Sequence, residues 1–85
     1  MPWIMEIDID GIHGCSTERW VPLSMEKKAP YEYDRAIEAM SMLCICYPDQ
    51  VRSDRLSGLE GRKCTRIRET TTGKIVYGNG NPAAA

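Results

Sequence analysis

The sequence lacks long hydrophobic stretches. No part of the 85-residue chain approaches 18 consecutive apolar residues, so we expect no membrane-spanning helix. The first six residues have no basic region and include an acid, which is unlike a signal peptide, and we expect a cytoplasmic protein. The shares of hydrophobic (42%) and charged (27%) residues are ordinary for a folded protein and exclude full disorder. A chain of this length makes one domain at most.

Histidine is almost absent, and this argues against catalysis. The one histidine, His13, lies in a predicted turn from Gly11 to Gly14. A pairing with Cys15, two residues away on that turn, would be held too loosely for nucleophilic catalysis. The sequence also lacks G-x-G-x-x-G, Walker-type and zinc-finger spacings. We therefore expect no enzyme, no cofactor and no small-molecule substrate.

Four cysteines leave three interpretations open: reduced thiols, two disulfides or a zinc site. Without a secretory signal, thiols are expected to stay reduced and to pack as small apolar side chains. In a helix, Cys44 and Cys46 would point about 200° apart and could not bridge to each other. The chain has enough candidate ligands for a zinc site: His13, Cys15, one of the two helical cysteines, and Cys64. Because the C-x₂-C spacing typical of such sites is missing, we predict no metal.

The net charge of −1 hides a polarity along the chain. Residues 1–50 carry nine acids and four bases, whereas residues 51–69 carry six bases and three acids. Such asymmetry indicates either a charged partner or two halves of one fold that pair with each other.

Two segments near the N-terminus are predicted to be strands. Residues 3–9 alternate strictly between apolar and polar positions after Ile4, which is typical of a strand with one buried face. Residues 19–23 form a second, shorter candidate. Because Pro22 has no N–H to donate, this strand is expected at a sheet edge or at a bulge.

A helix of about 17 residues is predicted to begin near Pro30 and to end at Tyr47, before Pro48. From Met40 to Tyr47 almost nothing is polar, so the apolar surface extends beyond one stripe. Either other segments cover the excess, or it meets a partner or a second copy of the chain. The residues concerned are Met42, Ile45 and Cys46.

The C-terminal half is predicted to contain a loop and a hairpin. Residues 49–62 are polar and read as a loop, with at most a helical turn near 54–59. Residues 63–77 form two alternating runs around Thr70–Gly73, which predicts a hairpin with glycine in its turn. Residues 78–85 have nothing to bury and are predicted to be a disordered tail. The expected fold is α+β: an antiparallel sheet of three to four strands with one amphipathic helix on one face, in a single domain over residues 1–77.

Glu6, Asp8 and Asp10 share one face of the first strand, about 7 Å apart in succession. Three interpretations of this acidic face remain open. The carboxylates could pair with Arg66 and Arg68 on a neighbouring strand, because opposite charges across strands are favourable. They could instead bind a protein, or serve a metal or catalysis.

The basic segment is a candidate nucleic-acid site, with Arg52, Arg55, Arg62, Lys63, Arg66 and Arg68. No aromatic residue is interleaved with these bases for stacking, and the pI near 5.8 is far below the basic range of most nucleic-acid-binding domains. Direct nucleic-acid binding is therefore not expected.

The order of elements over residues 18–77, and the residue types of the closing hairpin Arg66–Tyr77 (RIRETTTGKIVY), resemble small phage-encoded inhibitor proteins, among them anti-CRISPR proteins. The resemblance implies a non-enzymatic inhibitor that acts in the host bacterial cytoplasm. Its expected partner is a CRISPR surveillance complex or effector, or another host protein complex, and it would block nucleic-acid binding or nuclease recruitment.

Under this hypothesis acidic residues contact the basic residues with which the target grips DNA or guide RNA. The protein-binding candidates are Glu6, Asp8, Asp10 and Glu18, with Glu32, Asp34 and Glu38 as a second acidic surface on the helix. The alternatives are a nucleic-acid accessory protein that uses the basic segment, and a structural module that self-associates through Met42, Ile45 and Cys46. Both a monomer and a homodimer remain open.

Overall fold

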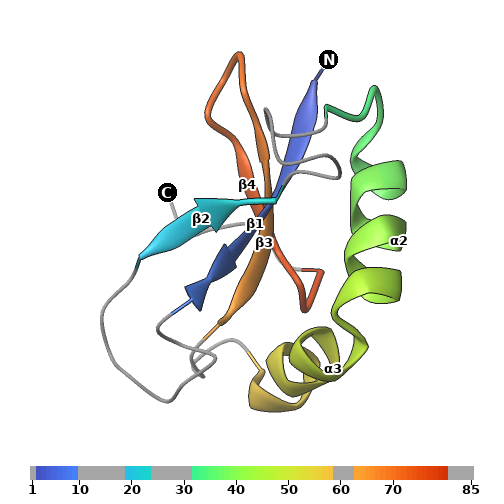
Figure 1. The fold of residues 1–85 in the computed structure, drawn as a ribbon, viewed down its shortest axis with the longest axis vertical. Helices are drawn as coiled ribbons and strands as arrows, with labels where there is room; N and C mark the ends of the chain where they lie inside the picture. The colour runs from blue at the N-terminus through green and yellow to red at the C-terminus, as the bar shows by residue number, and fades with distance from the viewer. Residues whose placement is uncertain (1, 10–18, 24–31, 59–62, 81–85) are drawn as a thin grey trace.

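The computed structural model describes residues 2–9, 19–23, 32–58 and 63–80. Within these ranges the chain forms four strands and two helices (Figure 1). The elements are β1 (Trp3–Asp8), β2 (Trp20–Pro22), α2 (Ala36–Cys46), α3 (Pro48–Ser57), β3 (Thr65–Glu69) and β4 (Ile75–Tyr77). The α+β class with an antiparallel sheet is thus confirmed, and a second helix is added to the one predicted.

The strands lie in the order β2-β1-β3-β4, and all neighbours are antiparallel. β1 therefore lies between β2 and β3, with Glu6 facing Pro22 on one side and Arg66 on the other. All six residues of β1 are buried. The expectation of one buried face and one solvated face is wrong for this strand, because a central strand can be covered on both sides.

The edge position predicted for the second strand is confirmed. Leu23 N donates to Met5 O (2.9 Å), and Ile9 N donates to Arg19 O (3.3 Å). Because bonded positions alternate along an antiparallel strand, the backbone nitrogen of Pro22 faces the open edge of the sheet. The N–H that proline lacks is thus not needed for the pairing with β1.

The long helix starts later than predicted, at Ala36 rather than near Pro30. Tyr33 instead pairs with Trp3: Trp3 N donates to Tyr33 O (2.7 Å), and Tyr33 N donates to Trp3 O (2.8 Å). Arg35 is extended as well, with φ −126° and ψ 141°. Backbone pairing with β1 holds this stretch extended, whatever its helical periodicity. Residues 24–31, which include the predicted start, lie outside the described residues.

The polar segment after Pro48 is a ten-residue helix, and the prediction of a loop is wrong for residues 49–57. Pro48 occupies the first turn, where a missing N–H costs nothing. Asp49 in the first turn and Arg55 in the last turn suit the helix dipole. Gly58 follows the helix with a positive φ of 68°. α3 reads as polar because, within it, only Val51 and Asp54 are buried.

The core lies between the sheet and the two helices. Its buried cluster draws on β1, β3, α2 and α3 and consists of Trp3, Met5, Ala39, Leu43, Val51 and Ile67. Figure 1 shows α2 alongside the sheet and α3 following it at a sharp bend. No helix in the described ranges is long and apolar enough to cross a membrane.

The C-terminal hairpin is confirmed, since β3 and β4 pair antiparallel across a turn in which Gly73 has a φ of 76°. Order continues beyond Tyr77. Gly78 is buried and its N–H donates to Thr65 O (2.8 Å), and the amide of Asn79 donates to Gly58 O (3.1 Å). The prediction of a disordered tail is therefore wrong for residues 78–80, and residues 81–85 lie outside the described ranges.

A buried carboxylate joins α3 to β3. Asp54 is fully buried; its Oδ1 accepts from Cys64 N (2.8 Å), and its Oδ2 accepts from Thr65 N (3.0 Å) and Thr65 Oγ1 (2.5 Å). Gly78 lies against this group so closely that a Cβ atom there would be 2.0 Å from Thr65 Oγ1. The two backbone donors at the start of β3 are thus satisfied by a side chain from the preceding helix.

Candidate binding surfaces

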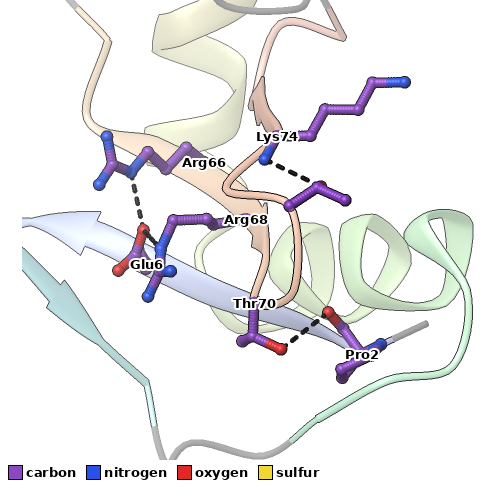
Figure 2. A network of polar contacts seen from close by, with 7 residues as sticks. Pro2, Glu6, Arg66, Arg68, Thr70 and Lys74 are labelled. Carbon is purple, nitrogen blue, oxygen red and sulfur yellow. Dashed lines mark hydrogen bonds and ion pairs between the residues drawn. The ribbon is translucent and has the colours of Figure 1, made fainter.

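Glu6 is paired with two arginines of the neighbouring strand. Its Oε1 accepts from Arg66 Nε (2.8 Å) and from Arg68 Nε (3.3 Å), as Figure 2 shows. The Glu6 side chain is 6% exposed, and those of Arg66 and Arg68 are 15% and 33% exposed. Of the interpretations left open for this strand face, pairing with Arg66 and Arg68 is therefore correct for Glu6. A buried carboxylate needs such partners, because an unpaired one would cost several kcal/mol.

Asp8 is also buried, with 1% of its surface exposed, and its Oδ1 accepts from Arg19 N (3.3 Å). Glu6 and Asp8 thus do not present an acidic surface to a partner, and the protein-binding role predicted for these two residues is wrong. The reason is that neighbouring groups cover both carboxylates: Arg66 and Arg68 lie against Glu6, and the backbone of Arg19 lies against Asp8. Asp10 and Glu18, predicted for the same surface, lie outside the described residues.

Aromatic rings lie beside this ion-pair cluster. The guanidinium carbon of Arg66 is 4.2 Å from the centroid of the Trp20 ring, and the Trp20 and Tyr77 centroids are 6.3 Å apart. Because side chains alternate along β3, Arg66 and Arg68 point away from the core residue Ile67. The described helices pack on the other side of the sheet, against Trp3, Met5 and Ile67. We call the side away from these helices the open sheet face, defined by Glu6, Trp20, Arg66, Arg68 and Tyr77.

The rings on the open sheet face were not anticipated from the basic segment, which contains no aromatic residue. Trp20 comes from β2 and Tyr77 from β4, on either side of the β1–β3 pair. Tyr77 lies directly opposite Arg66 in the register. No local sequence signal places Trp20 near these residues, since its position depends on which strands pair.

The hairpin end of the sheet is held by a second set of polar contacts (Figure 2). Thr70 donates to Pro2 O through its hydroxyl, as Figure 2 shows (3.4 Å), and through its backbone N–H (3.0 Å). Lys74 N donates to Thr72 Oγ1 (3.3 Å). The Thr72 hydroxyl in turn donates to Glu69 Oε1. These contacts hold the ends of β1, β3 and β4 together beside the open sheet face.

The acidic residues around the start of α2 are exposed. Glu32 and Asp34 precede the helix, and Glu38 lies in its first turn. Ile37, beside Glu38, is 62% exposed. We call these four residues the acidic α2 end. It combines three carboxylates with one large exposed apolar side chain.

The basic segment does not form a single surface. Arg52 and Arg55 are exposed on α3, in the helical layer, whereas Arg66 and Arg68 point to the open sheet face. Arg52 pairs with Asp49 at 3.6 Å, Arg55 donates to Cys44 Sγ at 3.6 Å, and Lys63 Nζ donates to Ser57 Oγ at 3.3 Å. Arg62 lies outside the described residues.

The predicted self-association residues divide between two environments. Met42 is half-buried and packs against the core, so other segments cover it. Ile45 is 72% exposed and Cys46 is also exposed, so they remain uncovered by the described residues. Leu56 on α3 is a further exposed apolar side chain, at 82%.

The cysteines and the acids do not converge. Cys44 and Cys46 form no disulfide, and Cys64 is buried with its backbone N–H bonded to Asp54. Across the described ranges, no three side chains of His, Cys, Asp or Glu lie close enough together to hold a metal ion. His13 and Cys15 are outside those ranges.

Comparison with known proteins gives no relative: no family model, no curated protein and no solved structure matches this chain.

Proposed function

We propose that this protein is a non-enzymatic inhibitor of the anti-CRISPR type, which binds a CRISPR surveillance complex or effector, or a comparable host complex, in the bacterial cytoplasm. The observation that carries the proposal is the acidic α2 end. There Ile37, which is 62% exposed, lies next to exposed carboxylates, one of them Glu38. Mixed acidic and apolar surfaces suit a protein target whose own surface is basic.

The proposed mechanism is competition. A basic groove that grips nucleic acid offers lysine and arginine side chains to phosphates, and carboxylates can occupy the same side chains. Ile37 would add a desolvated apolar contact next to them, of the kind that dominates the binding energy at interfaces. Such a mechanism needs neither turnover nor a cofactor.

The contact surface differs from the one predicted first. Glu6 and Asp8 are engaged within the fold, so the proposal rests on the exposed set around the start of α2. Glu32 and Asp34 precede the helix and Glu38 lies in its first turn, so all three can be reversed without altering a core residue.

The test is an interference assay combined with affinity capture from bacterial cells that carry an active CRISPR system, with and without nuclease treatment. The tagged wild type should capture a nuclease-resistant protein complex and should inhibit it. Reversal of the acidic α2 end (Glu32→Lys, Asp34→Lys, Glu38→Lys) should abolish both effects, and Ile37→Ser should weaken them.

The matched control is Asp49→Lys. Like Glu38, Asp49 is an exposed acid in the first turn of a helix, so its reversal costs a similar amount of helix-dipole stabilisation. This control should inhibit as the wild type does. Inhibition retained by the folded triple variant, or lost equally in the control, would overturn the proposal.

A further inference from the structure

The two arginines of the open sheet face use only part of their hydrogen-bonding capacity. Arg66 and Arg68 each donate through Nε to the same oxygen of Glu6. Their terminal Nη groups donate no hydrogen bond to any described residue. A guanidinium has five N–H donors in a planar fork that matches phosphate oxygens. The cluster thus presents unused donors from two adjacent guanidiniums.

The charges of this cluster differ in accessibility. The Glu6 side chain is 6% exposed, whereas those of Arg66 and Arg68 are 15% and 33% exposed. Asp8 lies on the same face but is 1% exposed and accepts from the backbone N–H of Arg19, so the more accessible charges are those of the two arginines. Arg68 is the more accessible of the paired arginines, with a third of its side chain exposed. An anionic group approaching the open sheet face would meet Arg68 first.

Flat aromatic surfaces adjoin these donors. Trp20 and Tyr77 are both partly exposed, and their ring centroids are 6.3 Å apart on either side of the Arg66 position. A ring that is not fully buried can stack on an unpaired base, and this contact tolerates any sequence. The rings come from the two outer strands, β2 and β4, and approach each other from either side of the β1–β3 pair.

From this combination we infer that the open sheet face binds single-stranded nucleic acid. Phosphates contact the Nη groups of Arg68 and Arg66, and a base stacks on Tyr77, next to the Trp20 ring over which the Arg66 guanidinium lies. A single strand is favoured over a duplex because stacking on a protein ring needs a base that is not already paired. This site lies on the opposite side of the sheet from α2, so it is separate from the acidic α2 end.

The experiment is fluorescence anisotropy of a labelled oligo-dT strand with the whole protein, over a range of ionic strengths. Binding is expected at low ionic strength, with weaker binding to a duplex of the same length. Tyr77→Ala should reduce the affinity by about 5- to 150-fold, the loss typical of one base-stacking contact. Arg68→Gln should weaken binding and lower the salt slope by about 0.7, as expected for the loss of one phosphate contact on a single strand.

Arg52→Gln is the matched control, because it removes an exposed arginine from the helical layer. It should bind oligo-dT as the wild type does. A polyphosphate probe without bases separates stacking from general anion binding: it should bind more weakly than oligo-dT and should not respond to Tyr77→Ala. Affinity that falls with Arg52→Gln but not with Arg68→Gln would overturn the inference, as would the absence of binding at low ionic strength.

A second readout does not depend on a variant that could lose its fold. Trp20 is partly exposed, whereas the other tryptophan, Trp3, is 9% exposed in the core. Oligo-dT should therefore quench part of the intrinsic fluorescence of the wild type, and Trp20→Phe should remove that quenching. Unchanged fluorescence at saturating oligo-dT would contradict stacking at this site.

The same variants separate this inference from the proposed function. Reversal of the acidic α2 end should leave oligo-dT binding intact while abolishing capture of the protein complex. Arg68→Gln should weaken oligo-dT binding and leave capture of the protein complex intact.

Discussion

At the residue scale, Asp54 carries the most concentrated set of contacts. Three donors at the start of β3 converge on its carboxylate, and no solvent reaches it. A chain of 85 residues has a small core, so its total stability is modest and the loss of such a group takes a large share of it.

Replacing Asp54 by Ala should destabilise the protein by about 3 kcal/mol or more, because each buried donor left without an acceptor costs roughly 1–3 kcal/mol. The measurement is the free energy of unfolding from denaturant titration. Asp49→Ala on the same helix, at an exposed position, should lower it by less than about 1 kcal/mol, mainly through the helix dipole. Equal effects of the two substitutions would contradict the role assigned to Asp54.

Gly78 is required for space rather than for a positive φ. A Cβ atom at this position would meet Thr65 Oγ1 at 2.0 Å and Asp54 Oδ2 at 2.9 Å. We expect Gly78→Ala to cost about 1–3 kcal/mol, as other overpacked sites do. In the Thr65→Ala background the penalty should shrink, because the clashing oxygen is gone; a double-mutant cycle measures this coupling. Strict additivity would show that the clash is not with Thr65.

At the scale of elements, Glu6 joins the central strand β1 to the arginines of β3. Glu6→Ala would leave Arg66 and Arg68 close together without the carboxylate between them. We expect a loss of about 1–3 kcal/mol in unfolding free energy, because the partners of a largely buried charge lose their counter-charge. Glu38→Ala, at an exposed position, should lose less than about 1 kcal/mol, mainly through the helix dipole. Similar losses for both would argue against the cluster.

A proline substitution tests whether α3 is helical in solution or is the loop that its polar composition predicted. Ser53 lies in the interior of α3 and is exposed. Ser53→Pro should therefore destabilise the protein by about 3 kcal/mol, whereas Ser53→Ala should be neutral or slightly stabilising. Thermal unfolding of both variants makes the comparison. A Ser53→Pro variant as stable as the wild type would mean that these residues are not helical in solution.

At the scale of the whole molecule, the sheet separates two surfaces of different character. The acidic α2 end lies with the helical layer, and the open sheet face, with its paired arginines and rings, lies on the other side. The acidic N-terminal half and the basic segment therefore neutralise each other in part inside the fold, where Glu6 pairs with Arg66 and Arg68. The remaining acids of the acidic α2 end and the arginines of the open sheet face lie on opposite sides of the sheet.

Local patterns in the sequence determined the hairpin over residues 63–77, the first strand, the proline-bearing edge strand and the apolar stripe of α2. These features depend on side-chain periodicity and on proline and glycine, which act on the backbone of their immediate neighbours. The start and end of α3 were also encoded locally, in Pro48 and Gly58, but its polar composition outweighed those signals in the prediction.

Strand order and register decided the rest. The alternation of β1 could not reveal that both its faces are buried, because burial depends on the strands and side chains that cover it. The carboxylate of Glu6 has the same chemistry whether it meets solvent or Arg66, and only the register places these two residues opposite each other. Trp20 and Tyr77 are 57 residues apart in the chain, and their rings meet because β2 and β4 flank the same strand pair. Contacts of this kind come from tertiary pairing, which no local pattern in the sequence specifies.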